Sequence, residues 1–510
     1  MTDRFNLIEE PWIPIASGGL VSLNDVFTDL SLSALGGNPV QKIALTKLLL
    51  AITQAACTPA DDAEWLALEP TTMVERARAY LARWHDRFFL YGEKPFLQMP
   101  AIKAAKKQSY GAVSPEVSTG NTTVLTQSQI EHPLQDADKA SLLVTQMAFA
   151  LGGKKTDNSV SLSPGYQGKQ NAKGKPSTSK PGSAVAHMGQ LHSYWLGDCL
   201  IETLHLNLLT QQDIDRAGIF PAGVGTPPWE SMPEGEDDSV ARQLRISLMG
   251  RLVPLGRFCL LDDDALHYSE GILHPGYKDG VTDPTTSVDY SGKDPRTLWV
   301  NPDKRPWREL TAMLGFVRGN GQDGMDTLQI KAPLVRISQQ YPRFALWSGG
   351  LRVSSNAGEQ YASGTDDYVQ STIWLSAALT GETFFAYFSL EIAALDKLAK
   401  LLYASVTRYY RQLSDIDKSG KGKAQPFVSS RAEQATHLFW ELCERDAQRL
   451  VDACAAEDVD TPLAAMRRHF AGYVSEAFDQ ACPKASTRQL DAWAQSRPNL
   501  SQYLSRKEAA

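Results

Sequence analysis

Residues 390–410 read LEIAALDKLAKLLYASVTRYY, and from this stretch onward the chain has the pattern of a helical protein. Apolar side chains recur at steps of three and four residues, which places them on one face of a helix. They are Leu395, Leu398, Leu402, Val406 and Tyr409. Later stripes are Phe439, Leu442, Leu450 and Cys454, then Leu463, Met466, Phe470, Val474 and Phe478. Successive helices with short connections predict an antiparallel bundle of about four helices, with these stripes as its core.

The chain before this bundle is mixed. Residues 40–57 (VQKIALTKLLLAITQAAC) have helical spacing, and residues 71–90 predict a second helix with a threonine N-cap. Residues 242–261 alternate enough to suggest paired strands. We therefore predict an α+β fold, with a large N-terminal domain of unusual architecture over residues 1–375 and a C-terminal bundle over residues 376–510.

Within the bundle, the start of one helix can be predicted from two residues. Thr461 is expected as the N-cap and Pro462 as the first helical residue, because proline has no N–H to lose at that position.

The composition is that of an ordinary globular chain with an acidic balance. Of 510 residues, 43% are apolar and 21% are charged, and the formal net charge is −7. An acidic total gives no global attraction to nucleic acid, so any such binding depends on local basic patches. The first residues lack the apolar core of a signal peptide, and no apolar run reaches the roughly 18 residues of a membrane span. We expect a cytoplasmic protein that does not bind membranes.

Residues that could carry catalysis are scattered. The six cysteines include no CxxC pair, which argues against a zinc site and against a disulfide framework. His187 and His192 are five residues apart, which would place them on different faces of a helix. GxSxG and HExxH are absent. We therefore expect no cofactor, no metal and no catalytic residue.

One acidic cluster leaves an alternative open. Asp262, Asp263 and Asp264 are consecutive and could hold a metal ion, as in a metal-dependent nuclease. Successive side chains diverge, however, so a solvated turn is the favoured interpretation.

The stretch 161–181 (SLSPGYQGKQNAKGKPSTSKP) is basic and almost without apolar residues. Between Lys154 and Lys180 there are six lysines and one acid. Gly165 and Gly168 flank Tyr166, so the backbone there can approach a partner closely. The lysines can neutralise phosphates without reading sequence. On composition alone, a disordered surface loop is the alternative interpretation.

Seven segments in a fixed order carry a family resemblance. They are FNLIEEPWIPI (5–15), RFFLYGEKPFLQMPAIK (87–103), VSTGNTTVLTQ (117–127), SPGYQG (163–168), PPWE (227–230), LWVNPDKRPWREL (298–310) and LWSGGLRVSSNAGEQ (346–360). Together they resemble the CasA-type large subunit of the type I-E CRISPR surveillance complex, Cascade. The resemblance covers essentially the whole chain.

The resemblance implies a binding function without catalysis. Such a subunit recognises the protospacer-adjacent motif (PAM) in duplex DNA and starts unwinding and R-loop formation, while the guide RNA reads the sequence by base pairing. The implied partners are the crRNA, PAM-containing double-stranded DNA, the backbone, small and handle-binding subunits, and the helicase-nuclease that joins after R-loop formation.

The resemblance also implies site residues, residue by residue. The family's glycine loop matches SPGYQG, so Gly165, Tyr166, Gln167 and Gly168 are expected at the PAM, with the bare backbone of Gly168 facing the DNA. The surrounding lysines are expected on phosphates: Lys154, Lys155, Lys169, Lys173, Lys175 and Lys180. Lys278 is the match for a lysine that enters the minor groove, where side chains can partly distinguish A·T from G·C pairs.

The family's strand-separating wedge is a hairpin tip that matches Ser355, Asn356 and Ala357. A glutamine fills the family's tip and is absent here, so the chemistry of the tip differs. Gly349, Gly350 and Gly358 are expected in a tight hairpin. A further loop implies contacts to the crRNA handle and neighbouring subunits, through Asn121, Thr122, Thr123, Leu125 and Gln127. Leu125 replaces an aromatic found in some relatives.

Two other functions remain as alternatives. One is a metal-dependent nuclease that uses Asp262–Asp264. The other is a scaffold that holds RNA and protein subunits together without reading DNA.

Overall fold

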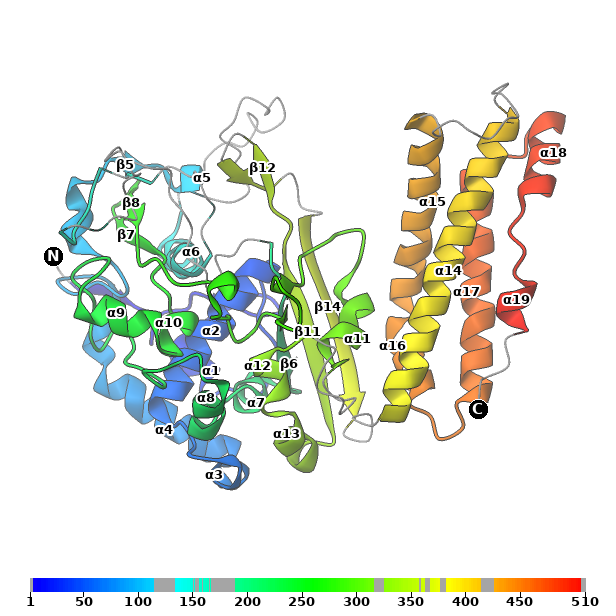
Figure 1. Ribbon diagram of the computed structural model, residues 1–510. Helices are drawn as coiled ribbons and strands as arrows, with labels where there is room; N and C mark the ends of the chain where they lie inside the picture. Colours follow the sequence, from blue (N-terminus) through cyan, green and yellow to red (C-terminus); the bar gives the residue numbers. More distant parts are fainter. Residues whose placement is uncertain are drawn as a thin grey trace. The chain divides into compact units, whose positions relative to one another are not determined.

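The computed structural model describes residues 3–113, 134–149, 151, 156–157, 159–164, 166, 189–315, 325–356, 359–362, 367–376, 382–413 and 426–505. Contacts within the chain divide it into two compact units (Figure 1). Unit 1 comprises Met1–Pro306, Ala312–Phe316 and Asn320–Thr372; unit 2 comprises Trp307–Thr311, Val317–Gly319 and Ile373–Ala510. Unit 1 mixes short helices with small sheets and unit 2 is helical, which confirms the predicted α+β class. The expected domain limits, 1–375 and 376–510, stay a prediction.

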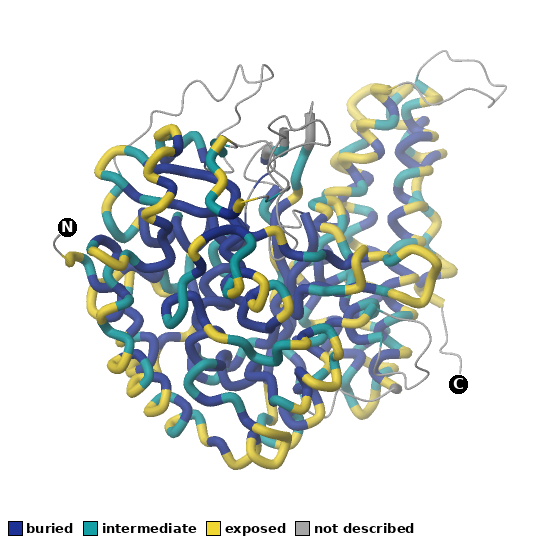
Figure 2. The backbone as a smooth tube through the Cα atoms, turned by 60° about the vertical axis from the view of Figure 1, so that its left-hand side comes forward, coloured by how far each residue is buried: buried dark blue, intermediate teal, exposed yellow. Residues whose placement is uncertain are grey.

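Helix α2 (Pro39–Ala56) is the most deeply buried long helix of unit 1. The Asn38 side chain caps it by accepting from Gln41 N at 2.9 Å, and the Gln41 amide oxygen accepts from Asn38 N at 3.0 Å. Pro39 fits the first helical position. Fourteen of its eighteen residues are buried, so other elements enclose this helix on several sides. Buried segments are dark blue in Figure 2.

The other helices before residue 341 are shorter. They are α1 (Leu23–Val26), α3 (Asp62–Ala67), α4 (Pro70–Arg83), α5 (Tyr110–Val113), α6 (Asp136–Ala148), α7 (Leu200–Leu206), α8 (Gln211–Ala217), α9 (Ser239–Arg245), α10 (Met249–Leu252), α11 (Leu310–Met313), α12 (Leu328–Lys331) and α13 (Leu334–Gln340). The 3-10 turns are η1 (His85–Arg87), η2 (Pro100–Ala104), η5 (Tyr277–Asp279) and η6 (Pro306–Glu309).

The strands form small sheets. They are β1 (Arg4–Asn6), β2 (Ile13–Pro14), β3 (Leu20–Val21), β4 (Phe89–Tyr91), β5 (Lys107–Gln108), β6 (His192–Leu196), β7 (Arg257–Leu261), β8 (Leu266–Glu270), β9 (Val288–Asp289), β10 (Arg296–Thr297), β11 (Arg343–Leu351), β12 (Ser354–Asn356), β13 (Glu359–Tyr361) and β14 (Tyr368–Ser376). Two sheets have three strands, in the orders β14–β11–β6 and β5–β8–β7. Strands β11 and β6 run antiparallel, with Gly349 opposite His192.

The prediction of paired strands over residues 242–261 is wrong for most of that range. Helices α9 and α10 occupy its first part, because the Asp238 side chain accepts from Ala241 N at 2.7 Å and so caps α9. Only β7 is a strand, and its partner is β8, which lies outside the expected range.

Both predicted threonine caps are also wrong. Helix α4 begins at Pro70, and Glu69 is its N-cap without a side-chain bond. In unit 2, helix α17 (Asp460–Ala481) begins before Thr461, because the Asp458 carboxylate accepts from Asp460 N at 3.2 Å and from the Thr461 hydroxyl at 3.0 Å.

Unit 2 consists mainly of helices. They are α14 (Glu382–Leu413), α15 (Pro426–Arg445), α16 (Ala447–Cys454), α17, α18 (Thr487–Ser496) and α19 (Ser501–Leu504). Figure 1 shows α14, α15 and α17 side by side, and all the apolar stripe residues predicted from the sequence are buried in this unit. The arrangement is compatible with a bundle of about four helices.

A short segment that precedes the bundle helices in the sequence completes the core of unit 2. The Arg308 guanidinium lies 3.4 Å from the centre of the Trp440 ring and donates to Asp396 Oδ1 at 2.8 Å. The ring of Trp307 meets the same Trp440 at 6.2 Å. Residues 307–311 therefore belong to the helical unit despite their place in the sequence.

Two further features concern the state of the cysteines and the apolar content of the helices. All six cysteines lie in the described part of the chain as free thiols, and five of them are buried. Among the described helices, none combines the length and apolar content that a bilayer crossing requires.

Four histidines are buried in unit 1: His192, His205, His267 and His274. The expectation that His192 lies on a helix is wrong, because its segment pairs with β11 as strand β6; His187 lies outside the described residues. Burial lowers the pKa of His192 and His274 to about 3 and that of His205 to about 4. In the unfolded chain the pKa of histidine is about 6.5. Below pH 6.5 the unfolded state therefore binds more protons than the folded state.

Acid is consequently expected to destabilise unit 1. Between pH 7 and pH 5 its free energy of unfolding should fall by about 1–2 kcal/mol for each of His192, His205 and His274. Urea titrations at the two pH values measure this, and His192→Gln should reduce the pH dependence. Equal pH dependence in His192→Gln and the wild type would contradict the assignment.

Candidate nucleic-acid interface

The basic loop begins at a firmly held backbone segment. The Glu236 carboxylate is fully buried and accepts from Leu162 N at 3.2 Å and from Ser163 N at 2.8 Å. The Ser163 hydroxyl accepts in turn from Asp237 N at 2.9 Å. Because a buried carboxylate needs such donors, these contacts fix the chain immediately before the SPGYQG segment.

Of the four residues expected at the PAM in this loop, residues 165–168, the structure describes Tyr166. Its N–H donates to Ser163 O at 3.1 Å and its hydroxyl to Gly271 O at 3.4 Å. Burial, reinforced by the charge of Glu270, raises the pKa of the phenol. The ring therefore anchors the start of the loop to the end of β8.

The described chain that follows the basic loop and the start of the predicted wedge lie together. After the basic loop, the described chain resumes at Gly189 and continues into β6. Strand β11 leads into the wedge hairpin. Antiparallel pairing places His192 opposite Gly349. A Cβ on Gly350 would lie 2.9 Å from Gln190 O, and a Cβ on Gly189 would lie 3.8 Å from Leu351 O. Two segments about 160 residues apart in the sequence thus meet at one end of this sheet.

The predicted hairpin is present as β12 and β13. Asn356 pairs with Glu359 in this hairpin. The hairpin is tied at its root by Arg352, whose N–H donates to Asp367 O at 2.8 Å and whose guanidinium lies 2.5 Å from the Asp367 carboxylate. The placement of Gly349 and Gly350 in the hairpin is wrong, because both lie inside β11, where neighbouring chain leaves no room for a side chain.

Lys278 lies in the middle of the 3-10 turn η5 and is exposed. The turn is held by Gly276 N, which donates to Asp279 Oδ2 at 2.8 Å. The hydroxyl of Tyr290 donates to Tyr277 O at 3.1 Å and braces it from outside. An ammonium group on such a fixed turn is available to a ligand.

The other predicted site residues lie outside the described residues. From the glycine loop and the wedge tip these are Gly165, Gln167, Gly168 and Ala357. From the phosphate set they are Lys154, Lys155, Lys169, Lys173, Lys175 and Lys180. From the crRNA-handle set they are Asn121, Thr122, Thr123, Leu125 and Gln127. Their roles stay predictions.

The acidic cluster forms the turn between β7 and β8. Lys107 donates to the Asp262 carboxylate and lowers its pKa. Arg4 donates to Asp263 Oδ1 at 3.3 Å, and Asp263 is 83% exposed. The first two carboxylates thus have different basic partners. Among the residues that the structure describes, no group of three or more His, Cys, Asp or Glu side chains is placed to hold a metal ion.

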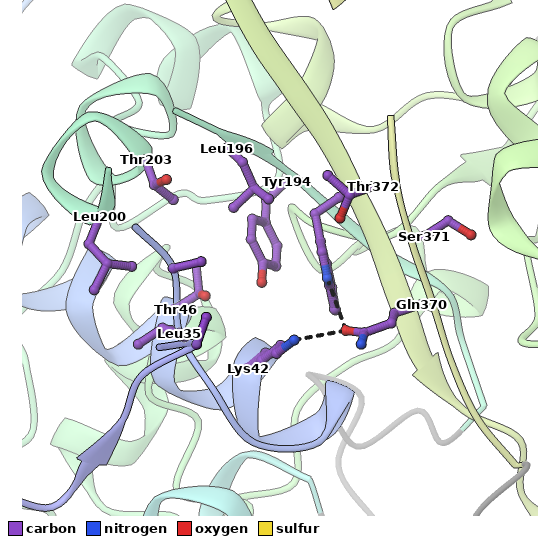
Figure 3. Close-up of a pocket in the computed structure, with 13 residues that line it drawn as sticks. Leu35, Lys42, Thr46, Tyr194, Leu196, Leu200, Thr203, Gln370, Ser371 and Thr372 are labelled. Carbon is purple, nitrogen blue, oxygen red and sulfur yellow. Dashed lines mark hydrogen bonds between the residues drawn. The ribbon is translucent and has the colours of Figure 1, made fainter. Parts of the chain in front are cut away.

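A cavity that no sequence pattern predicted opens on unit 1 (Figure 3). Its volume is about 210 Å³, and its walls come from α2, α7, β6, β11 and β14. Tyr194 stacks on Trp347 with ring centres 4.6 Å apart. Lys42 Nζ donates to Gln370 Oε1 at 3.0 Å, and the same oxygen accepts from Trp347 Nε1 at 3.3 Å. Burial lowers the pKa of Lys42. The Lys42 amine is hydrogen-bonded to Gln370, another residue of the cavity wall.

Known proteins share this fold over nearly the full length. A curated relative, CRISPR-associated protein CasA/Cse1 of Thermus thermophilus, is 28% identical over 341 residues, which are 61% of this chain and 60% of that protein. A crystal structure of CasA from the same organism superposes with a TM-score of 0.70 at 20% identity, covering 98% of this chain and 99% of that one.

A chain of a structure described as a CRISPR RNA-guided surveillance complex gives a TM-score of 0.66 at 17% identity, covering 98% of this chain and 99% of that one. Likeness at these identities establishes the fold. The family model of CRISPR-associated protein Cse1 matches residues 6–477. As the ordered segments of the sequence predicted, this chain belongs to the CRISPR-associated protein Cse1 family.

Proposed function

We propose that this chain is the large subunit of a crRNA-guided surveillance complex of the Cascade type. It recognises the PAM in double-stranded DNA through the minor groove, starts duplex unwinding and R-loop formation, and supports recruitment of the helicase-nuclease. The family membership supports the first part, together with the fold shared with a chain of an RNA-guided surveillance complex. The chain itself carries out binding and strand separation and breaks no covalent bond.

One observation carries the proposal furthest: the antiparallel pairing of β6 with β11. It brings the end of the basic loop and the start of the hairpin to the same end of one sheet. A DNA-binding loop and a strand-separating tip must act on neighbouring base pairs, so they need adjacent roots. The chain at the start of the loop is anchored by Glu236, which accepts from Ser163 N.

In this proposal each predicted residue has a separate task. Gly165, Tyr166, Gln167 and Gly168 face the PAM, and Lys278 enters the minor groove. The loop lysines neutralise phosphates, which gives affinity without sequence discrimination. The tip at Ser355, Asn356 and Ala357 enters the base stack; unstacking costs a few kcal/mol per step, and pairing with the guide RNA compensates for lost DNA pairing. Residues 121–127 contact the crRNA handle and neighbouring subunits.

Neutralising the loop lysines should change the salt dependence of binding. The triple variant Lys169→Gln, Lys173→Gln, Lys175→Gln, in the assembled complex, should lower the slope of log affinity against log salt by about 3, since each phosphate contact contributes about 0.9. Duplexes with a good and a mutated PAM should weaken alike. The matched control replaces the same lysines with arginine and should keep the slope. An unchanged slope in the glutamine variant would exclude these phosphate contacts.

The wild-type complex provides the decisive comparison between functions. We expect tighter binding to a duplex with a PAM selected from a randomised library than to the same duplex with that PAM scrambled. Equal affinities would favour the scaffold function instead. Metal-dependent cleavage of DNA by the chain, lost on replacing Asp262–Asp264 with alanine, would favour the nuclease.

A further inference from the structure

Trp299 differs from every other tryptophan of the chain. All eleven tryptophans lie in the described residues, and only Trp299 is exposed, with 52% of its surface accessible. Single exposed apolar side chains are common and need no explanation by themselves. The position and the rigidity of this one are what indicate a use.

The backbone that carries the indole is held on both sides. Leu191 N donates to Leu298 O at 2.9 Å, and Val300 N donates to Gly189 O at 2.6 Å, so Trp299 lies opposite Gln190 in a β-bridge. Val300 is buried, and its Cγ2 would be 2.7 Å from a Cβ on Gly350. The ring therefore projects from a backbone that does not need to be ordered on binding, which lowers the entropic cost of a contact.

The indole of Trp299 lies near two chain segments, the one that follows the basic loop and the one that leads into the hairpin. The basic loop and the hairpin are the two elements assigned to DNA binding. Gly189, which follows the basic loop in the sequence, has a φ of +86°, and a Cβ there would lie 3.5 Å from Cε3 of Trp299 and 3.8 Å from Leu351 O. The absence of a side chain at Gly189 lets the six-membered ring of the indole lie close to the backbone. Leu351 is three residues before the first residue of β12.

We propose that Trp299 is a stacking platform for an unpaired DNA base released when the duplex opens at the hairpin. This inference rests on the function proposed above. An indole stacks on any base without reading its sequence, which suits a strand whose sequence changes with every target. The segment that precedes Gly189 in the sequence carries six lysines and one acid between residues 154 and 180, which favours a polyanion over an acidic or neutral protein surface.

The geometry limits which base can be held. From Leu351 to residue 357 at the tip is six residues, at most about 20 Å of extended chain. This equals about six base-pair rises of 3.4 Å. The stacked base is therefore expected within the first six nucleotides beyond the point of strand separation.

The test uses the assembled complex and duplexes with 2-aminopurine at one of those six positions. In the wild type, the fluorescence of 2-aminopurine at one position should be quenched after opening, because the base stacks on the indole. Trp299→Ala should abolish this quenching and weaken binding to the opening duplex about tenfold, within the range of one base–aromatic stack. Trp299→Phe should restore most of both effects. Phe427→Ala is the control, because Phe427 is an exposed aromatic (55%) that the inference does not use.

A second duplex, with an interstrand cross-link beside the PAM, separates recognition from opening. Trp299→Ala should bind it as the wild type does. If the wild type discriminates PAMs on this duplex while Trp299→Ala opens DNA normally, the stacking inference is wrong and the proposed function stands. If the wild type fails to discriminate PAMs, the proposed function itself fails. Loss of subunit assembly in Trp299→Ala, with an unchanged melting curve of the chain, would make Trp299 a protein contact and overturn the inference.

Discussion

Gly168→Asp is expected to lower the affinity of the assembled complex for a PAM-containing duplex by at least about 100-fold. The substitution places a carboxylate where the proposal has bare backbone against DNA. Like charges brought together at an interface cost several kcal/mol, and each 1.4 kcal/mol is a factor of ten in affinity. The added side chain also prevents the close approach that glycine permits. Gel-shift titration of complexes with equal subunit content measures the loss.

The chain offers a matched control within the same loop. Gly174→Asp adds the same charge between Lys173 and Lys175 but lies outside the SPGYQG segment. It should weaken good-PAM and scrambled-PAM duplexes alike and only by the loss of one charge contact. Equal losses for the two variants would mean that charge, and not the backbone at residue 168, determines PAM binding.

Lys47→Met is expected to reduce the free energy of unfolding of unit 1 by about 3–5 kcal/mol, the usual cost of breaking a buried ion pair. Lys47 and Asp283 have side chains that are 1% and 0% exposed and form a salt bridge. Lys47 also donates to Arg251 O at 3.2 Å, and Asp283 Oδ1 accepts from the Thr285 hydroxyl at 2.7 Å. Burial alone would raise the pKa of the Asp283 carboxyl, but the Lys47 ammonium holds it below its ordinary value. Without Lys47 a buried carboxylate loses its counter-charge.

The sign of the pH effect follows from this change in pKa. In Lys47→Met the carboxyl should titrate above its ordinary pKa, so the deficit in stability should be largest at neutral pH and shrink in acid. The double variant Lys47→Met, Asp283→Leu should recover much of the loss, because neither partner of the pair is then left buried without the other. Lys331→Met is the control: its pair with Asp326 is exposed on both sides and should contribute at most about 1 kcal/mol. A small effect of Lys47→Met, equal to that of Lys331→Met, would contradict the role of the buried pair.

Local periodicity predicted the parts of the fold that depend on local sequence. The stripes of α14 and α17 are buried as expected, because a 3.6-residue period needs no knowledge of the partner helix. Helix limits were less predictable: at α17 the side chain of Asp458 competes with Thr461 for the cap. The prediction of strands over residues 242–261 was wrong because the aspartate before them caps a helix. Alternation of side chains does not reveal that cap.

The candidate site could be predicted only in part for a similar reason. The segments SPGYQG and SSNAGEQ can be recognised in the sequence, but their proximity depends on the pairing of β6 with β11 across about 150 residues. Strand pairing over such a separation leaves no local signal. Trp299 lay within a recognised segment, yet its exposure is a tertiary property. The cavity beside Lys42 depends on five elements that meet only in the folded chain.

The most direct test of the proposed function is a structure of the assembled complex bound to a duplex with its preferred PAM. We predict that the minor groove of the PAM contacts the backbone of residues 165–168, and that the tip at residues 356–358 lies at the first opened base pair. A structure in which the PAM contacts another surface, with both the loop and the hairpin away from the DNA, would contradict it.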